Sequence, residues 1–189
     1  MLSAIIATHE SERTLVPTLA ALVPAVTSGL LREVVVADAV STDATAEVAE
    51  IAGCRFMSSP EPLGGLLKAA AAATRTPWLL FLRAGTVPEA GWIPAAERFM
   101  QAAEMLDDAG HAAVFRRQSP MMQPGLGEVL VMLRAALGGA PKPEQGLLIA
   151  RRFYDALGGH AADADAEAAL LRKLGRRRIA MLAAGAANT

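Results

Sequence analysis

The chain has 189 residues, of which 53% are hydrophobic and 20% are charged, and its formal net charge is −1. This composition excludes an intrinsically disordered protein, and the length allows one domain with a sizeable core. The small net charge gives no electrostatic reason to expect a nucleic acid or an anionic membrane as a partner.

Strand and helix patterns alternate through the first half of the chain. Apolar runs predict strands at residues 2–7, 33–37 and 78–82, and a short strand is predicted at 55–58. Apolar residues at helical spacing predict three helices between them, at residues 15–26, 45–52 and 63–75. Such alternation predicts an α/β fold with a mostly parallel sheet and helices on both of its faces.

The second half has a less regular pattern. It predicts a helix from near Glu89 to 108, an edge strand at 112–115, a helix at 125–137, a strand at 146–150, a helix at 163–174 and a last strand at 179–182. We find no internal repeat and no composition shift that would mark a domain boundary. The chain is therefore predicted to form a single domain.

No segment resembles a membrane span or a secretory leader. The apolar run at 129–133 is far too short to cross a bilayer and is followed directly by Arg134. The N-terminus has no basic region before its first apolar run, so we interpret that run as a strand. The lone Cys54 cannot form an intramolecular disulfide, and we expect a buried thiol in a cytoplasmic protein.

The most informative segment runs from Glu33 to Thr45. A short apolar run ends in Asp38, and a Ser-Thr-Asp turn ending in Asp43 then leads into a helical pattern. Ligands of open α/β sheets bind at the carboxyl edge of the strands, where Asp38 could accept a hydrogen bond from a nucleobase or a ribose. The alternative interpretation is a solvated acid at a strand end, followed by an ordinary helix cap at Asp43.

Four further segments, taken with this one, resemble the signatures of one family. Residues 33–45 resemble D-G-G-S-T-D-G-T, and residues 2–10 resemble an opening strand followed by P-T-x-N-E. Residues 78–86 resemble L-L-F-L-H-A-D-T, residues 144–146 resemble D-Q-G, and residues 150–159 resemble R-R-x-x-F followed by L-G-G-F. Their order is that of family 2 glycosyltransferases, and they cover nearly the whole chain. The chain is most similar to a small bacterial subgroup of this family that is often found beside radical-SAM proteins.

The resemblance implies a GT-A-like domain over residues 1–189, with a nucleotide-binding half at 1–82 and an acceptor-side half at 83–189. It implies a nucleotide sugar, most simply of the UDP type, as the donor, and an acceptor that the sequence does not identify. Residues Thr8, Glu10, Asp38 and Asp43 match positions of the nucleotide-binding segments.

The charged groups around the donor diphosphate depart from the family pattern. The family holds Mg²⁺ or Mn²⁺ through a D-x-D motif, but this chain has Arg83-Ala84-Gly85 at that position. We therefore expect no metal there and assign Arg83 to the diphosphate, where an arginine fork can bind phosphate oxygens. The arginine of the loop before the third helix is also missing, and Lys68 is the cation that remains.

The catalytic acid is placed by its register in the last helix. Alignment with E-D-x-x-L-x-x-R-L puts Glu167 at the position of the family's aspartate, and Asp165 is the second candidate. A carboxylate there would deprotonate the acceptor hydroxyl. The alternative is a solvated helix face, because acids in a first helical turn are favoured by the helix dipole in any case. Arg151 and Arg152 could face a phosphate or be surface charges.

These observations leave two main hypotheses for function. The first is a metal-independent glycosyltransferase that uses a nucleotide sugar. The second is a catalytically degenerate relative that serves as a binding or partner-docking module. A nucleotidyltransferase-like protein fits less well, because the turn after the first strand lacks the glycine-rich basic loop that such a protein needs.

Overall fold

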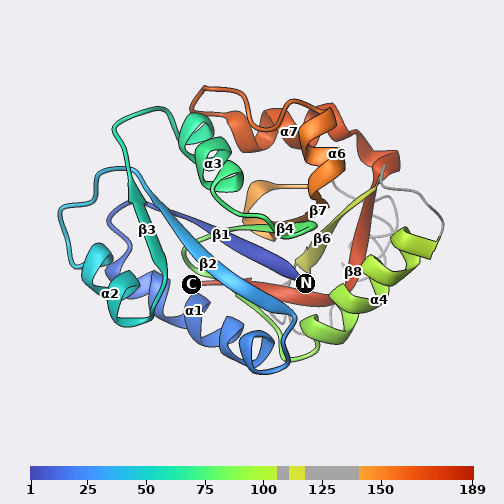
Figure 1. Ribbon diagram of the computed structural model, residues 1–189, viewed down its shortest axis with the longest axis horizontal. Helices are drawn as coiled ribbons and strands as arrows, with labels where there is room; N and C mark the ends of the chain where they lie inside the picture. The colour runs from blue at the N-terminus through green and yellow to red at the C-terminus, as the bar shows by residue number, and fades with distance from the viewer. Residues whose placement is uncertain (106–110, 118–140) are drawn as a thin grey trace, which may run out of the picture.

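The computed structural model describes residues 1–105, 111–117 and 141–189, which form one sheet with helices on both faces. The sheet has the strand order β3-β2-β1-β4-β7-β6-β8-β5. Helices α1, α2 and α4 lie on one side of it, and α3, α6 and α7 lie on the other (Figure 1). This arrangement is the α/β fold with a mostly parallel sheet that the strand–helix alternation predicts, in the single GT-A-like domain that the family resemblance implies.

The first half of the chain contains the parallel part of the sheet. Its elements are β1 (Leu2–Thr8), α1 (Glu12–Thr27), β2 (Leu31–Asp38), α2 (Thr45–Ile51), β3 (Arg55–Ser58), α3 (Leu63–Ala72) and β4 (Trp78–Arg83). Strand β1 pairs in parallel with both β2 and β4, and β2 pairs in parallel with β3. All seven residues of β1 are buried, which explains why a continuous apolar run rather than an alternating pattern marks this central strand.

The second half mixes strand directions. Its elements are β5 (Thr86–Pro88), α4 (Trp92–Met105), β6 (Ala112–Arg117), the 3₁₀-helix η1 (Pro143–Gln145), β7 (Leu147–Ala150), α6 (Arg151–Ala156), α7 (Ala166–Leu174), the 3₁₀-helix η2 (Arg176–Arg178) and β8 (Ile179–Asn188). Strand β7 runs antiparallel to β4 and β6, β6 pairs in parallel with β8, and β5 closes the edge antiparallel to β8.

Several predicted boundaries in this half were wrong. The strand expected at an edge, β6, is interior, because β7 and β8 pair with its two sides. Strand β8 continues to Asn188, six residues beyond its predicted end, and β5 was not predicted. Helix α4 begins at Trp92 rather than near Glu89. The helix expected at 125–137 lies outside the described residues.

One continuous apolar core joins the two halves. Strands β1 and β4 contribute fully buried aliphatic residues, and Trp92 and Phe115 bring aromatic rings from the second half. The two rings meet edge to face with centroids 6.2 Å apart. Burial of such rings is a major source of stability, so the core supports one cooperative domain. Within the described residues, no helix is both long enough and apolar enough to cross a membrane.

Candidate active site

Three loops meet at the carboxyl edge of the parallel strands. In the strand register, Thr8 lies beside Asp38 and Ala7 lies beside Arg83. The loop backbones are also joined, since Ala39 N–H donates to the Thr8 carbonyl at 2.9 Å and Ala84 N–H donates to the Ala7 carbonyl at 3.0 Å. The ends of β1, β2 and β4 therefore form one continuous surface, as the sequence predicts.

The Asp38 side chain is buried at the centre of this edge and is saturated by hydrogen bonds. It is 1% exposed. Its Oδ1 accepts from the hydroxyls of Thr8 at 2.9 Å and Ser41 at 2.5 Å, and its Oδ2 accepts from Ser41 N–H at 2.8 Å and the Ser58 hydroxyl at 3.2 Å. Four donors fill the acceptor sites of a carboxylate. A nucleobase would contact Asp38 only by replacing one of these donors.

Glu10 holds the loop that follows β2. Its Oε1 accepts from Thr42 N–H at 2.8 Å and from the Thr42 hydroxyl at 3.1 Å, and its own N–H donates to the Ser41 hydroxyl at 2.8 Å. Glu10 and Val40 both have positive φ, of 48° and 57°. Val40 stands at the second glycine of the D-G-G-S-T-D pattern, and its backbone conformation explains why a glycine suits that position.

Asp43 joins the starts of two helices. Its Oδ1 accepts from Thr45 N–H and the Thr45 hydroxyl at the beginning of α2, and its Oδ2 accepts from Glu12 N–H at the beginning of α1. The hydrogen bond from the Thr45 hydroxyl lowers the pKa of Asp43 below its ordinary value. Asp43 thus accepts hydrogen bonds from backbone N–H groups at the N-termini of both helices, which is consistent with the capping interpretation.

Arg83 and Glu167 form an ion pair across the edge. The Nε and Nη2 atoms of Arg83 lie 2.8 and 2.5 Å from Oε2 of Glu167, and Nη1 lies 3.9 Å from a carboxylate oxygen of Glu144. The hydrogen bond to Glu167 raises the pKa of Arg83. The pair joins the segment that resembles the D-x-D motif to the residue predicted as the catalytic acid, 84 residues apart in the chain.

The other two predicted residues lie apart from this pair. Asp165 is exposed immediately before α7, and its Oδ2 accepts from Arg172 at 2.9 Å. Lys68 is exposed on α3. Of the two catalytic candidates, Glu167 is therefore the one that contacts Arg83.

The start of α3 is closed by the segment before α7. Gly64 N–H donates to the Asp163 carbonyl at 3.1 Å. A Cβ at Gly64 would come 1.7 Å from the Ala161 carbonyl oxygen and 2.4 Å from Cβ of Ala166. The backbone of the segment before α7 therefore lies directly against the start of α3. It occupies the space beside the loop before α3, the loop that lacks the family arginine.

Gly85, at the third position of the D-x-D segment, is equally enclosed. Its N–H donates to the Thr18 hydroxyl at 2.9 Å and its carbonyl accepts from Thr189 N–H at 3.0 Å. Its φ is +92°, and a Cβ there would lie 2.7 Å from the Thr189 carbonyl oxygen. A carboxylate at this position would need both a strained backbone and a shift of Thr189.

Comparison with known proteins identifies the family. Residues 3–120 match the family described as Glycosyl transferase family 2. The chain belongs to glycosyl transferase family 2. No curated protein matches it.

Solved structures similar to this chain include those of one enzyme of Mycobacterium tuberculosis. Its glucosyl-3-phosphoglycerate synthase with Mn²⁺, UDP and glucosyl-3-phosphoglycerate has a TM-score of 0.70 at 22% identity, over 100% of this chain and 72% of that chain. The same enzyme with Mn²⁺, UDP-glucose and phosphoglyceric acid has a TM-score of 0.67 at 22% identity, over 96% and 68%. At this identity the likeness shows the fold.

A divalent cation of the kind used in this family does not fit the residues at the D-x-D position. Arg83 brings a positive charge and Gly85 has no side chain, so neither can supply a carboxylate oxygen. Among the described residues, no three histidine, cysteine, aspartate or glutamate side chains are grouped so that they could hold a metal ion. The described residues at this position thus present an arginine–glutamate ion pair in place of a pair of carboxylates.

Arg151 has a structural role that the sequence did not reveal. Its Nε donates to the Thr76 carbonyl at 2.7 Å, its Nη1 donates to the Ala71 carbonyl at 2.9 Å and its Nη2 donates to the Thr74 hydroxyl at 2.5 Å. The guanidinium thus supplies hydrogen-bond donors to acceptors at the end of α3 and in the segment that leads into β4. Arg151 is therefore held by three hydrogen bonds within the protein and is not a free surface charge.

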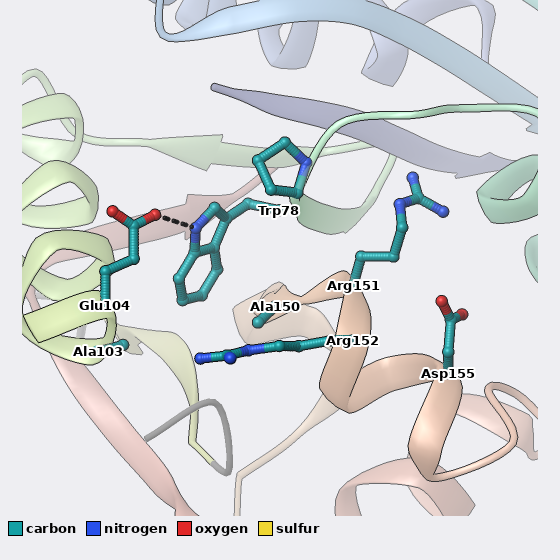
Figure 2. Close-up of a pocket in the computed structure, with 8 residues that line it drawn as sticks. Trp78, Ala103, Glu104, Ala150, Arg151, Arg152 and Asp155 are labelled. Carbon is teal, nitrogen blue, oxygen red and sulfur yellow. Dashed lines mark hydrogen bonds between the residues drawn. The ribbon is translucent and has the colours of Figure 1, made fainter. Parts of the chain in front are cut away.

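Arg151 also lines a cleft of about 540 Å³ at the opposite edge of the sheet (Figure 2). Trp78 begins β4 and Ala150 ends the antiparallel β7, so the cleft lies at the amino ends of the parallel strands. The Trp78 indole N–H donates to Glu104 at 3.1 Å, as Figure 2 shows. This cleft is thus separate from the Asp38 edge.

Sequence reasoning missed the hydroxyl partners of Asp38 and the position of Gln145. Gln145 is 6% exposed, and its amide donates to the Phe115 carbonyl at 2.8 Å. Its Oε1 accepts from Lys142 N–H at 3.0 Å. The D-Q-G resemblance was the signal that this glutamine matters, and its contacts show that it fixes the segment that carries Glu144 toward Arg83.

Proposed function

We propose that the chain transfers a sugar from a UDP-type nucleotide sugar to an acceptor hydroxyl without a divalent cation, with Arg83 binding the donor diphosphate. The observation that supports this proposal is the contact between Arg83 and Glu167. A fixed cation stands where the family places metal ligands, and a carboxylate stands where the family places its catalytic acid.

Arg83 can reach a diphosphate from its present position. Its side chain is 41% exposed, whereas that of Glu167 is 10% exposed. Both bonds to Glu167 use one carboxylate oxygen, and among the described residues Nη1 has only the distant Glu144 as a partner. A guanidinium has five N–H donors, so it can bind phosphate oxygens while it keeps part of its contact with Glu167.

Glu167 serves as the general base in this proposal. While Arg83 is paired with it, one oxygen of the Glu167 carboxylate accepts two hydrogen bonds from the guanidinium. A diphosphate that attracts Arg83 would weaken this pairing, and that oxygen would then be free to accept the proton of the acceptor hydroxyl. Thr8 and Asp38 would lie at the nucleobase, with Asp38 exchanging one of its hydroxyl donors for the base.

Calorimetry with UDP in the presence of EDTA tests the nucleotide part of the proposal. We expect the parent to bind, and we expect Arg83→Ala to weaken binding by about ten- to a hundredfold, since hydrogen bonds to charged groups contribute about 1.5–3 kcal/mol. Arg98→Ala is the matched control, because Arg98 is an exposed arginine on α4. Equal binding by the parent and Arg83→Ala, or binding that requires Mn²⁺, would contradict the proposal.

A second candidate function is a nucleotide-binding or partner-docking module without catalysis. The saturated carboxylate of Asp38 and the closed start of α3 favour it, because both resemble a site that has been filled by the protein itself. Release of UDP from UDP-glucose in the presence of an acceptor mixture separates the two candidates. Turnover that falls by about 10²–10⁴-fold in Glu167→Gln supports the transferase. UDP binding without turnover supports the module.

A further inference from the structure

A basic cleft of about 420 Å³ lies at the amino edge of the sheet, away from Asp38. Arg32 is the second residue of β2, Arg55 is the first residue of β3, and Arg75 belongs to the turn before β4. All three arginines line the cleft, together with Glu33. Parallel strands bring their starts to one edge, which is why arginines distant in the sequence meet here.

The floor of this basic cleft is held by a chain of polar contacts. The Thr76 hydroxyl donates to the Ser3 hydroxyl at 2.8 Å, which donates to Glu33 at 3.1 Å. Glu33 lies 3.6 Å from Nη2 of Arg55, and Nη1 of Arg55 donates to the Ala73 carbonyl at 2.7 Å. Ser3 is fully buried and Thr76 is 8% exposed. Arg55 is therefore fixed in place, and its charge is partly balanced by Glu33.

The other two arginines have no such partner. Both Arg32 and Arg75 are exposed, and within the described part of the chain neither makes a hydrogen bond or an ion pair. The charged side chains that line the cleft are three guanidinium groups and one carboxylate, so their net charge is +2. This concentration is notable in a chain whose net charge is −1.

We propose that the basic cleft binds the dianionic phosphate group of a small soluble phosphate monoester. Two unpaired guanidinium forks match the charge and the oxygen geometry of such a group. The volume exceeds that of a phosphate alone, so the organic part of the ligand has room beside Pro77 and Ala73, which also line the cleft. Glu33 faces the same space, but Arg55 and Ser3 already engage its carboxylate.

Titration with phenyl phosphate, followed by amide chemical shifts and by calorimetry, tests this proposal. We expect saturable binding of one equivalent, with shifts at residues 31–33 and 73–77. The double variant Arg32→Gln/Arg75→Gln should bind at least about tenfold more weakly. The matched control Arg98→Gln should bind as the parent does. Arg83→Ala should also bind as the parent does, which separates this site from the proposed active site.

Two results would overturn the proposal. One is equal affinity of the parent and the double variant for phenyl phosphate, which would make the cleft an ordinary solvated charge cluster. The other is binding to vesicles that contain phosphatidic acid without any binding of phenyl phosphate, which would make the cleft part of a membrane surface. Unchanged thermal midpoints of the variants would show that the substitutions leave the fold intact.

Discussion

Val40 occupies a left-handed backbone conformation in the loop that crosses the Asp38 edge. A β-branched residue with a φ of 57° is strained. Val40 is also 49% exposed, so the packing of its side chain contributes little stability to offset this strain. The Glu10 carboxylate and the Ser41 hydroxyl hold the loop around it. Strain of this kind persists where the surroundings determine the conformation, as they do at binding sites.

Replacement of Val40 by glycine should therefore stabilise the protein. A left-handed conformation costs about 1–2 kcal/mol for a residue with a Cβ, while glycine loses about 0.5–1 kcal/mol more conformational entropy on folding. We expect Val40→Gly to raise the free energy of unfolding by up to about 1 kcal/mol in urea titrations. Val16→Gly is the control, since Val16 is an equally exposed valine inside α1, and this substitution should cost about 0.3–0.5 kcal/mol of helix propensity.

The partners of single residues were the least predictable feature of the site. The sequence located Asp38 at a strand end and Arg83 at the D-x-D position, because both follow directly from local patterns. It did not indicate that Ser58 donates to Asp38 or that Arg83 pairs with Glu167. Those contacts join residues 20 and 84 positions apart, and they depend on strand order and helix placement.

At the scale of elements, the contact between α3 and the start of α7 is a point of close packing. Gly64 touches the backbone of Ala161, so a methyl group there forces the two segments apart. We expect Gly64→Ala to lower the free energy of unfolding by about 1–3 kcal/mol, the usual range for overpacking. Gly65→Ala provides the control in the same helix turn.

The control should behave differently for a physical reason. A Cβ at Gly65 would lie 3.2 Å from a carboxylate oxygen of Glu61, a flexible side-chain end that can move. Alanine also has the higher helix propensity, by about 1 kcal/mol. Gly65→Ala should therefore be neutral or stabilising. Equal destabilisation by both substitutions would show that the α3–α7 contact is not the cause.

The element boundaries illustrate what local patterns can and cannot predict. Three of the first four strands were found because each is an apolar run flanked by turn residues, and the short β3, Arg-Phe-Met-Ser, was placed by the strand–helix alternation. The end of β8 was missed because its residues 183–187 are alanine and glycine, which have weak strand propensity. They extend as a strand because β5 and β6 pair with them. Tertiary pairing thus overrides propensity here.

At the scale of the whole molecule, the parallel half could be predicted and the antiparallel half could not. Strand–helix alternation limits the first half to a few topologies, because such crossovers are right-handed. No comparable rule places β7 between β4 and β6, since both neighbours are distant in the sequence and both run antiparallel to it. The site lies at the junction of the halves, so its composition was predicted and its contacts were not.

This junction also contains a buried histidine that links stability to pH. His160 is 2% exposed, lies edge-on to Phe81 and contacts the Tyr154 hydroxyl through Nδ1 at 2.9 Å. The His160 backbone N–H donates to the same hydroxyl, so we infer that the Tyr154 hydroxyl in turn donates its hydrogen bond to Nδ1. Burial lowers the pKa of His160 to about 4 and raises that of Tyr154 to about 12, so both groups are neutral in the folded protein.

Folding stability should fall as the pH falls from about 6.5 to about 4, because in this range His160 is protonated in the unfolded chain and stays neutral in the folded chain. The shift corresponds to about 3 kcal/mol in total, of which about 2 kcal/mol is lost by pH 5. Urea titrations at pH 7.5 and pH 5 measure this loss. His160→Gln removes the titrating group and should lose about 2 kcal/mol less than the parent between the two pH values. His9→Gln, at an exposed histidine, should lose as much as the parent. An identical pH response of His160→Gln and the parent would mean that His160 is protonated at little cost. The conclusion that His160 is neutral in the folded protein would then be wrong.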